Sequence, residues 1–112
     1  MSVPQLNHRM VLETPMHTAD GAGGYSESWA PLGEMWAELV GRSGRATVQG
    51  TVPVSQANYK ITMRGAPEGD PRRPMAEQRF RAGSRIFNIS AVVERDALCR
   101  YLVCFAQEEV AT

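Results

Sequence analysis

The sequence predicts an all-β protein, a small single-domain β-barrel of about six strands with one long projecting loop. Apolar and polar residues alternate with a period of two in several segments, which is typical of strands that bury one face. Gly-rich turn sequences separate these segments. No stretch shows the periodicity of an amphipathic helix of three turns. Short strands joined by such turns favour a barrel or a sandwich.

Length and hydrophobicity are consistent with one domain. The chain has 112 residues, and 43% of them are hydrophobic, enough for a single compact core. The first seven residues contain no cationic stretch followed by an apolar run, so we expect no signal peptide. No apolar run approaches the roughly 20 residues of a membrane span. We therefore expect a soluble protein that does not act at a membrane.

The N-terminal part of the chain contains three segments with strand character. In the last of them, Met35, Ala37 and Leu39 are expected on the face opposite Trp36 and Val40. Both tryptophans of the chain are expected in the barrel core or at its rim. The expected elements are a strand at His8–Glu13 with Leu6, Met10 and Leu12 on one face, a turn at Asp20–Gly24, a strand at Tyr25–Trp29 and a strand at Glu34–Val40.

The C-terminal part contains the clearest alternation. Ala57–Arg64 is expected to bury Tyr59, Ile61 and Met63 and to expose the residues between them, including Thr62. Two further strands follow, with a hairpin turn at Ala82–Ser84 before the first. They are Arg85–Val93, with Phe87, Ile89, Ala91 and Val93 on one side, and the nearly continuous apolar run Leu98–Phe105.

Two segments do not fit the strand pattern. Residues 41–56 form a long connection with three glycines and a proline, and residues 65–76 form a Pro- and Gly-rich loop that we expect to be exposed. Connections longer than about 12–15 residues are uncommon in compact domains and are usually functional or disordered. We therefore expect the functional residues of this protein in the segment 41–56, as a projecting assembly loop.

Charge is unevenly distributed, although the net charge is zero. Residues 1–41 have one arginine against five acidic residues, residues 42–85 have nine cations against three, and residues 86–112 have two against four. A chain that is acidic at both ends and basic in the middle could pair with copies of itself. An ordinary solvated surface explains the same distribution.

The sequence offers little for catalysis or metal binding. His8 lies in an alternating strand and His17 in the turn region, and neither has a second ligand at metal-binding spacing. Cys99 and Cys104 are five positions apart, which on a strand places them on opposite faces and argues against a disulfide. The glycines at 21–24 lack the ending of a phosphate-binding loop. We expect no enzyme, no cofactor and no metal.

A nucleic-acid-binding barrel is an alternative interpretation. The Arg-rich middle, with Phe80 and Phe87 near it, is compatible with single strands that stack on aromatic rings. The isoelectric point near 6.7 is low for a nucleic-acid-binding domain of this size.

Several motifs, taken together and in order, carry a resemblance to a known family. The motifs are His8–Leu12, Asp20 with Gly23–Gly24, Glu27–Trp29, Met35–Glu38, Gly41–Gly44, Tyr59–Arg64 and Arg85–Ile89. With them the chain resembles the phage head-tail joining proteins, also called head-tail adaptors, head-closure proteins or stoppers, which occur in tailed phages, prophages and gene transfer agents. The resemblance covers residues 6 to 106.

The resemblance implies a place and a set of partners. It implies a homo-oligomeric ring, six- or twelve-fold, in the neck of a virion or phage-like particle assembled in a bacterial cytoplasm. The portal-adaptor protein would lie above it and the tail terminator or tail tube below. Packaged DNA would pass through the channel without being read in sequence. A tail-completion or baseplate protein with a similar small barrel remains an alternative.

Residues of the two loops are the candidate protein interface. The arginines offer planar donors to carboxylates or phosphates, and the valines alternate as in a strand added to a partner. We expect residues 41–56 to become ordered when a partner supplies contacts. The candidates are Arg42, Ser43, Gly44, Arg45, Val48, Val52, Val54, Arg72 and Arg73.

Overall fold

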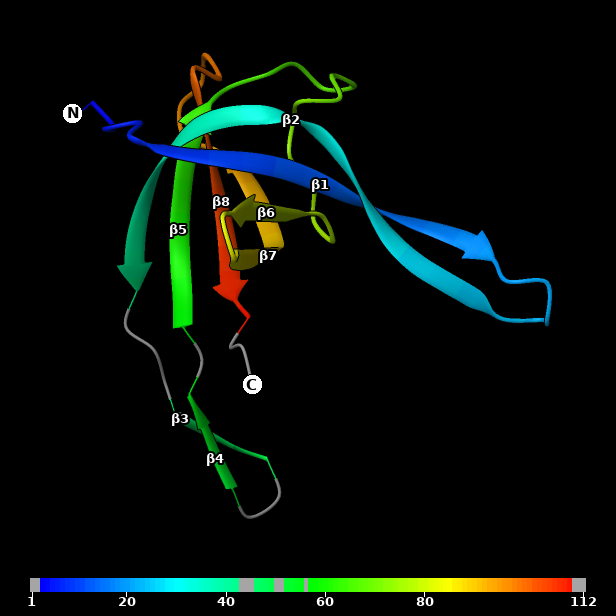
Figure 1. The fold of residues 1–112 in the computed structure, drawn as a ribbon. Helices are drawn as coiled ribbons and strands as arrows, with labels where there is room; N and C mark the ends of the chain where they lie inside the picture. Colours follow the sequence, from blue (N-terminus) through cyan, green and yellow to red (C-terminus); the bar gives the residue numbers. More distant parts are fainter. Residues whose placement is uncertain (1–2, 43–45, 50–51, 56, 110–112) are drawn as a thin grey trace.

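The computed structural model describes residues 3–42, 46–49, 52–55 and 57–109 (Figure 1). All regular elements in these ranges are strands, which confirms the predicted all-β class. They are β1 (His8–Ala19), β2 (Tyr25–Arg42), β3 (Ala46–Gln49), β4 (Val52–Ser55), β5 (Ala57–Arg64), β6 (Arg79–Ala82), β7 (Arg85–Glu94) and β8 (Tyr101–Glu108).

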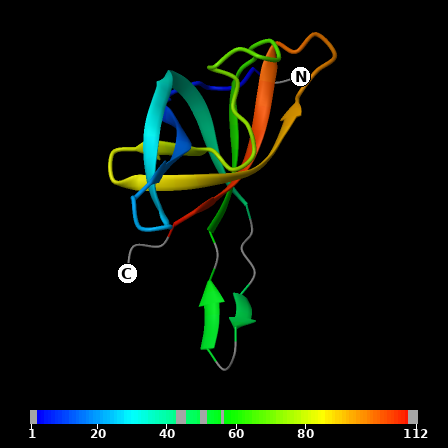
Figure 2. The ribbon, with the colours of Figure 1, turned by 90° about the vertical axis from the view of Figure 1, so that its right-hand side faces the viewer.

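Six of the strands form one closed barrel in the order β1-β2-β5-β8-β7-β6, in which every neighbouring pair is antiparallel. The barrel closes where Val11–Glu13 of β1 pairs with Arg79–Arg81 of β6. The remaining strands, β3 and β4, pair only with each other. In Figure 2 this small hairpin lies apart from the barrel, beyond the ends of β2 and β5.

Inward-facing side chains from all six barrel strands fill the core. Their burial follows the period of two, as predicted for Met10, Leu12, Ala37, Ile61 and Met63. Two phenylalanines from β6 and β7 are the largest fully buried side chains. The buried hydrophobic cluster comprises Met10, Leu12, Ala37, Ile61, Met63, Phe80, Phe87, Ile89, Leu102, Cys104 and Ala106.

The turn at Gly83–Ser84 joins β6 to β7 as predicted. Gly83 has a φ of 64°, whereas Ser84 has no positive φ, which matches a type II′ hairpin turn. Such turns twist in the same sense as the strands they join, so this connection keeps β6 and β7 in register.

The alternation predicted for Arg85–Val93 is wrong in its second half. The register of β7 against β8 shifts between Ile89 and Ala91, which leaves Ser90 as the extra residue of a β-bulge. A shift of one residue moves the following side chains to the other face. Ala91 and Val93 are therefore exposed, and Val92 packs against the core instead.

One further expectation, the exposure of Thr62, is wrong. Thr62 is buried although it alternates with core residues. The N-terminal segment reaches this outer face, since the N–H of Gln5 donates a 2.9 Å hydrogen bond to Glu38, the register partner of Thr62, and Pro4 is buried. The expected facing of Trp36 is confirmed, because Ala37 is buried whereas Trp36 and Val40, on the opposite face, are exposed. Of the two positions expected for Trp36, the core is excluded, since 56% of its surface is exposed.

The two cysteines are free, as expected. Cys104 of β8 is buried, whereas Cys99 is half-buried and lies in the β7–β8 turn with a φ of 52°. The strand predicted from Leu98 thus begins only at Tyr101. The apolar run in the sequence starts before the strand, because it includes Leu98, which is an exposed residue of the preceding turn.

Candidate protein-interaction surfaces

The expected loop 41–56 contains a second hairpin. Strand β2 continues through Arg42, and β3 and β4 form an antiparallel pair in which Ala46 lies opposite Ser55. The β-branched residues of both short strands favour extended backbone despite the glycines and the proline. A segment that did not fit the strand pattern of the barrel therefore contains a strand pair of its own, which lies outside the barrel (Figure 1).

The register of this hairpin separates the three candidate valines. Val52 lies opposite Gln49 and Val54 opposite Thr47, whereas Val48 lies opposite Pro53. The valines therefore occupy different cross-strand rows. The candidates Ser43, Gly44 and Arg45 lie outside the described residues.

Arg42 and Arg72 are both exposed, but they lie in different parts of the molecule. Arg42 is the last residue of β2, and its guanidinium lies 4.9 Å from the centre of the Phe105 ring. Arg72 lies in the 65–76 loop, where it forms an ion pair with Asp70. The stem of Arg72 passes close to Gly33 of β2, so this loop leans against the barrel wall.

Arg73 does not project, in contrast to the sequence-based expectation for this loop. Its side chain is only 17% exposed, and its Nη1 donates a 2.8 Å hydrogen bond to the carbonyl oxygen of Ala66. Its other terminal nitrogen lies 3.6 Å from Glu94 of β7. Arg73 thus ties the 65–76 loop to the barrel.

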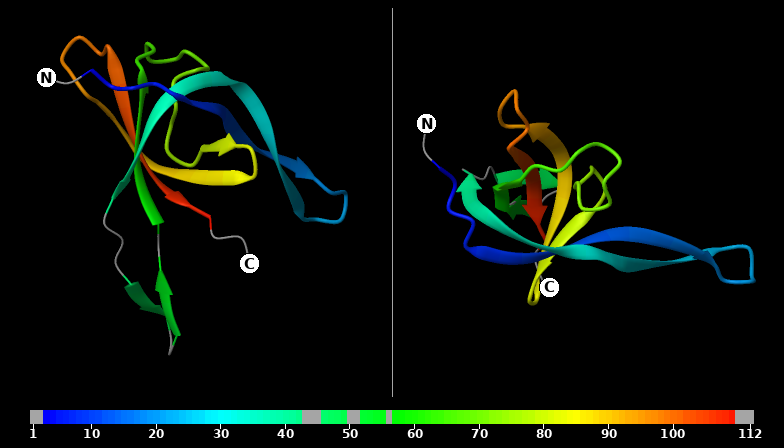
Figure 3. Two further views of the ribbon diagram at one scale, coloured as in Figure 1. Left: turned by 60° about the vertical axis from the view of Figure 1, so that its left-hand side comes forward. Right: turned by 90° about the horizontal axis from the view of Figure 1, so that it is seen from above.

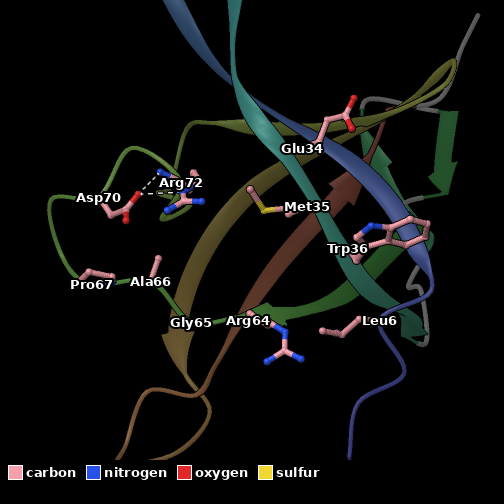
Figure 4. Close-up of a pocket in the computed structure, with 10 residues that line it drawn as sticks. All are labelled: Leu6, Glu34, Met35, Trp36, Arg64, Gly65, Ala66, Pro67, Asp70 and Arg72. Carbon is pink, nitrogen blue, oxygen red and sulfur yellow. Dashed lines mark hydrogen bonds and ion pairs between the residues drawn. The ribbon is translucent and has the colours of Figure 1, made fainter.

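A groove of about 390 Å³ opens between the middle of β2 and the 65–76 loop (Figure 4). One wall is formed by β2 and the N-terminal segment, and the other by the loop, whose Asp70 and Arg72 are joined by a salt bridge. Its lining contains both apolar and charged side chains. The groove is lined by Leu6, Glu34, Met35, Trp36, Arg64, Gly65, Ala66, Pro67, Asp70 and Arg72.

The first two strands form a long projection that the sequence analysis missed. Beyond the bulge at Leu12/Glu13, the segments Glu13–Ala19 and Tyr25–Pro31 pair with each other, and within them only Glu13, at the base, also pairs with a further barrel strand, at Arg79 of β6. We call this two-stranded segment the ribbon, and Figures 1 and 3 show it extending away from the barrel. The sequence signal for the ribbon was the strand-like character of the segments before and after the predicted turn at Asp20–Gly24. Pro15 and Pro31 weakened it, because prolines argue against regular strands.

The ribbon ends in a turn organised by Asp20. One carboxylate oxygen accepts hydrogen bonds from the N–H groups of Ala22 at 2.8 Å and Gly24 at 3.1 Å. These bonds lower the pKa of Asp20. Gly21 and Gly23 have φ values of 82° and 84°, which glycine adopts without strain.

A charged cluster fixes the base of the ribbon to the barrel. Glu13 is buried and accepts hydrogen bonds from Nε of Arg79 at 2.8 Å and from Nε of Arg81 at 3.0 Å. Burial alone would raise the pKa of Glu13, but the hydrogen bonds and charges of Arg81 and Arg79 outweigh it and lower the pKa. The cluster therefore holds an ionised carboxylate at the point where β1 leaves the barrel.

Two projecting hairpins and a groove offer surfaces for contacts with other macromolecules. In the described ranges, no three His, Cys, Asp or Glu side chains are grouped so that they could hold a metal ion. The same ranges contain no helix long and apolar enough to cross a membrane. A closed barrel with two projecting hairpins and a groove is an architecture suited to a structural assembly protein.

Comparison with known proteins gives the family. The chain belongs to the family described as "Phage head completion protein", whose match covers residues 1–109. This confirms the family resemblance found in the sequence, and with it a structural, non-enzymatic virion protein.

A solved structure is also similar. It is a chain from the "Virion of native gene transfer agent (GTA) particle", with 47% identity and a TM-score of 0.84, and the alignment covers 98% of this chain and 100% of that one. The comparison with curated proteins gave no match.

Proposed function

We propose that this protein forms a ring in the neck of a phage-like particle, where it joins the portal-adaptor to the tail and helps to retain packaged DNA. The observation that supports this most is the full-length similarity to a chain of a gene transfer agent virion. Membership of the head completion family is consistent with a position at the end of head assembly.

The architecture fits such a role. A closed barrel has no free sheet edge, so the barrel itself resists uncontrolled pairing with other strands. Contacts with partners are then left to the projecting elements. The β3–β4 hairpin is suited to reach a neighbouring protein, because it pairs with none of the barrel strands.

The exposed arginines are suited to acidic partner surfaces or to the phosphates of DNA in the channel. Arg42 and Arg72, together with the sequence-predicted Arg45, form this set, while the half-buried Arg73 is occupied by its contacts with Ala66 and Glu94. Individual surface ion pairs contribute only about 0–1 kcal/mol. We therefore expect the three charges to act together.

Deletion of the hairpin tests the proposal. Residues 43–54 are replaced by a short Gly-Ser turn, and the control replaces them with a Gly-Ser sequence of equal length. Because the hairpin makes no sheet with the barrel, both variants should retain the thermal transition of the wild type. Electron microscopy of the particles should show tailless heads for both variants and joined particles for the wild type.

The outcomes separate three interpretations. Joined particles with the deletion would show that the hairpin has no role in joining. Joined particles only with the long Gly-Ser control would show that reach matters and side chains do not. If the map of wild-type particles placed the protein outside the neck, the proposed function itself would be wrong.

A further inference from the structure

We propose that the ribbon of one copy docks in the groove of the next copy. This inference rests on the proposed function, because it names the contact through which copies join in the ring. The ribbon comprises Glu13–Ala19 and Tyr25–Pro31, and the groove is centred on Trp36 and the 65–72 segment. Both lie entirely in the described part of the chain.

The ribbon has the properties of an element that is completed by a partner. Two-stranded hairpins without a covering layer are at best marginally stable in water. Here neither face is covered by another element near the tip, where Tyr25 is 77% exposed and Met16 is also exposed. The ribbon nevertheless leaves the barrel in a fixed direction, because Arg79 contacts both Glu13 of β1 and Trp29 of β2.

The outer edges of the ribbon are poor sites for an added strand. Pro15 interrupts the free edge of β1, and Pro31 interrupts the free edge of β2. Proline has no N–H to donate to a neighbouring strand, and prolines of this kind protect edges from strand addition. A partner is therefore expected to receive the side chains of the ribbon's faces rather than extend its sheet.

The groove complements the ribbon in charge and polarity. Between residues 14 and 31 the ribbon and its turn contain Asp20 and Glu27 but no lysine or arginine. Two acidic residues of the groove are already paired, Glu34 with Arg9 and Asp70 with Arg72. The groove also presents Arg64, which is exposed and forms no salt bridge within the described residues, so it is available to an acidic partner. Beside it lies the exposed indole of Trp36, which offers an apolar surface for aromatic and aliphatic side chains.

Ribbon and groove occupy different parts of the molecule, so the contact would be heterologous. Six residue steps from Glu13 to Ala19 extend over about 20 Å at 3.4 Å per residue. The smallest extent of the molecule is 24 Å, so a ribbon of this length reaches across much of a neighbouring copy. Repeated head-to-tail contacts close into a ring when the rotation between copies permits it.

Photo-crosslinking in assembled particles tests the contact. The photoreactive p-benzoylphenylalanine replaces Tyr25, whose exposure makes the exchange compatible with folding. Irradiation should give a product with twice the mass of the chain. Its peptides should join residue 25 to Leu6, Glu34–Trp36 or Arg64–Arg72 of the second copy. The same group at Ser84, an exposed residue of the β6–β7 turn outside both the ribbon and the groove lining, is the control and should give no adduct in the groove.

A second variant keeps the inference falsifiable if the photoreactive chain does not assemble. Trp36→Glu alters an exposed groove residue and should leave the thermal transition within a few degrees of the wild type, yet the chain should be missing from purified particles. Val93→Glu, an exposed substitution on β7 outside the groove, is the matched control and should be incorporated normally.

Several results would overturn the inference. Adducts from residue 25 to another protein, or to a different surface of a second copy, would assign the ribbon another partner. Normal incorporation of Trp36→Glu would remove the groove from the contact. A ring found in the neck together with either result would leave the proposed function intact, whereas absence of the protein from the neck would contradict that function itself.

Discussion

The guanidinium of Arg79 covers the indole ring of Trp29, with its central carbon 4.0 Å from the ring centre. The same side chain donates a 2.8 Å hydrogen bond to Glu13. A single residue of the short strand β6 thus contacts both strands of the ribbon at its base. Arginine suits this position because its planar group can stack on a ring and pair with a carboxylate at once.

Arg79→Ala should lower the free energy of unfolding by about 2–4 kcal/mol. Removal of one partner from a buried ion pair leaves an incompletely compensated charge, although Arg81 still faces Glu13. The matched control is Arg9→Ala, because Arg9 forms an exposed cross-strand pair with Glu34 and should contribute less than about 1 kcal/mol. Urea unfolding followed by tryptophan fluorescence measures both. Equal losses for the two variants would contradict this account of the cluster.

The same cluster predicts how stability depends on pH. The pKa of Glu13 is lowered in the folded protein, so the unfolded chain takes up a proton first as the pH falls. The contribution of Glu13 is therefore complete above its ordinary value of 4.5 and is lost as the pH falls through the lowered folded pKa. Glu108 acts in the same direction, because its hydrogen bond with Arg85 lowers its pKa.

Glu13→Gln should consequently flatten the acid limb of the stability profile. Urea midpoints of wild type and variant between about pH 3 and pH 7 provide the measurement. The wild type should lose stability more steeply below pH 4.5 than the variant. Parallel acid limbs would show that Glu13 is not coupled to Arg79 and Arg81 in solution.

The two thiols should differ sharply in reactivity. Burial raises the pKa of Cys104 to about 12, and only the thiolate attacks alkylating reagents. Iodoacetamide at pH 8 should therefore modify one thiol of the native protein, at the half-buried Cys99, and both thiols in denaturant. Mass spectrometry counts the modifications. The control Cys99→Ser should remain unmodified while folded, and rapid modification of that variant would mean that β8 opens readily.

The period-two pattern predicted the closed barrel well. Phe87, Ile61 and Met63 were assigned to the core from alternation alone, because burial of one face imposes that spacing. The same rule failed after Ile89, where a bulge with Ser90 as its extra residue reverses the faces. The position of a bulge depends on the register with the partner strand, here β8, and the residues of β7 alone do not predict it.

The interaction surfaces were less predictable than the fold. The length of the segment 41–56 identified it as a candidate interaction element. The pairing of Ala46–Gln49 with Val52–Ser55 was not predicted, because the glycines of the segment favour an irregular connection. The ribbon was missed because its prolines resemble strand breaks, although their place on free edges is compatible with a strand. Arg73 appeared available in a Pro-rich loop, but its partners Ala66 and Glu94 become visible only when the loop folds back.

Gly65, the residue that follows β5, makes a contact that only the fold reveals. The N–H of Gly65 donates a 2.7 Å hydrogen bond to the carbonyl oxygen of Arg100 in the β7–β8 turn. A Cβ at position 65 would lie 1.9 Å from the carbonyl oxygen of Cys99, and backbone atoms cannot yield as a flexible side chain can. The close approach of these two segments therefore requires glycine.

Gly65→Ala should lower the free energy of unfolding by about 2–4 kcal/mol, because either the hydrogen bond to Arg100 breaks or both turns move apart. Gly33→Ala is the control: its Cβ would meet only the side chain of Arg72, at an ordinary distance of 3.5 Å, and should cost less than about 1 kcal/mol. Thermal unfolding of the two variants and the wild type provides the comparison. A Gly65→Ala protein as stable as Gly33→Ala would mean that the 65–76 loop does not hold this position against the β7–β8 turn in solution.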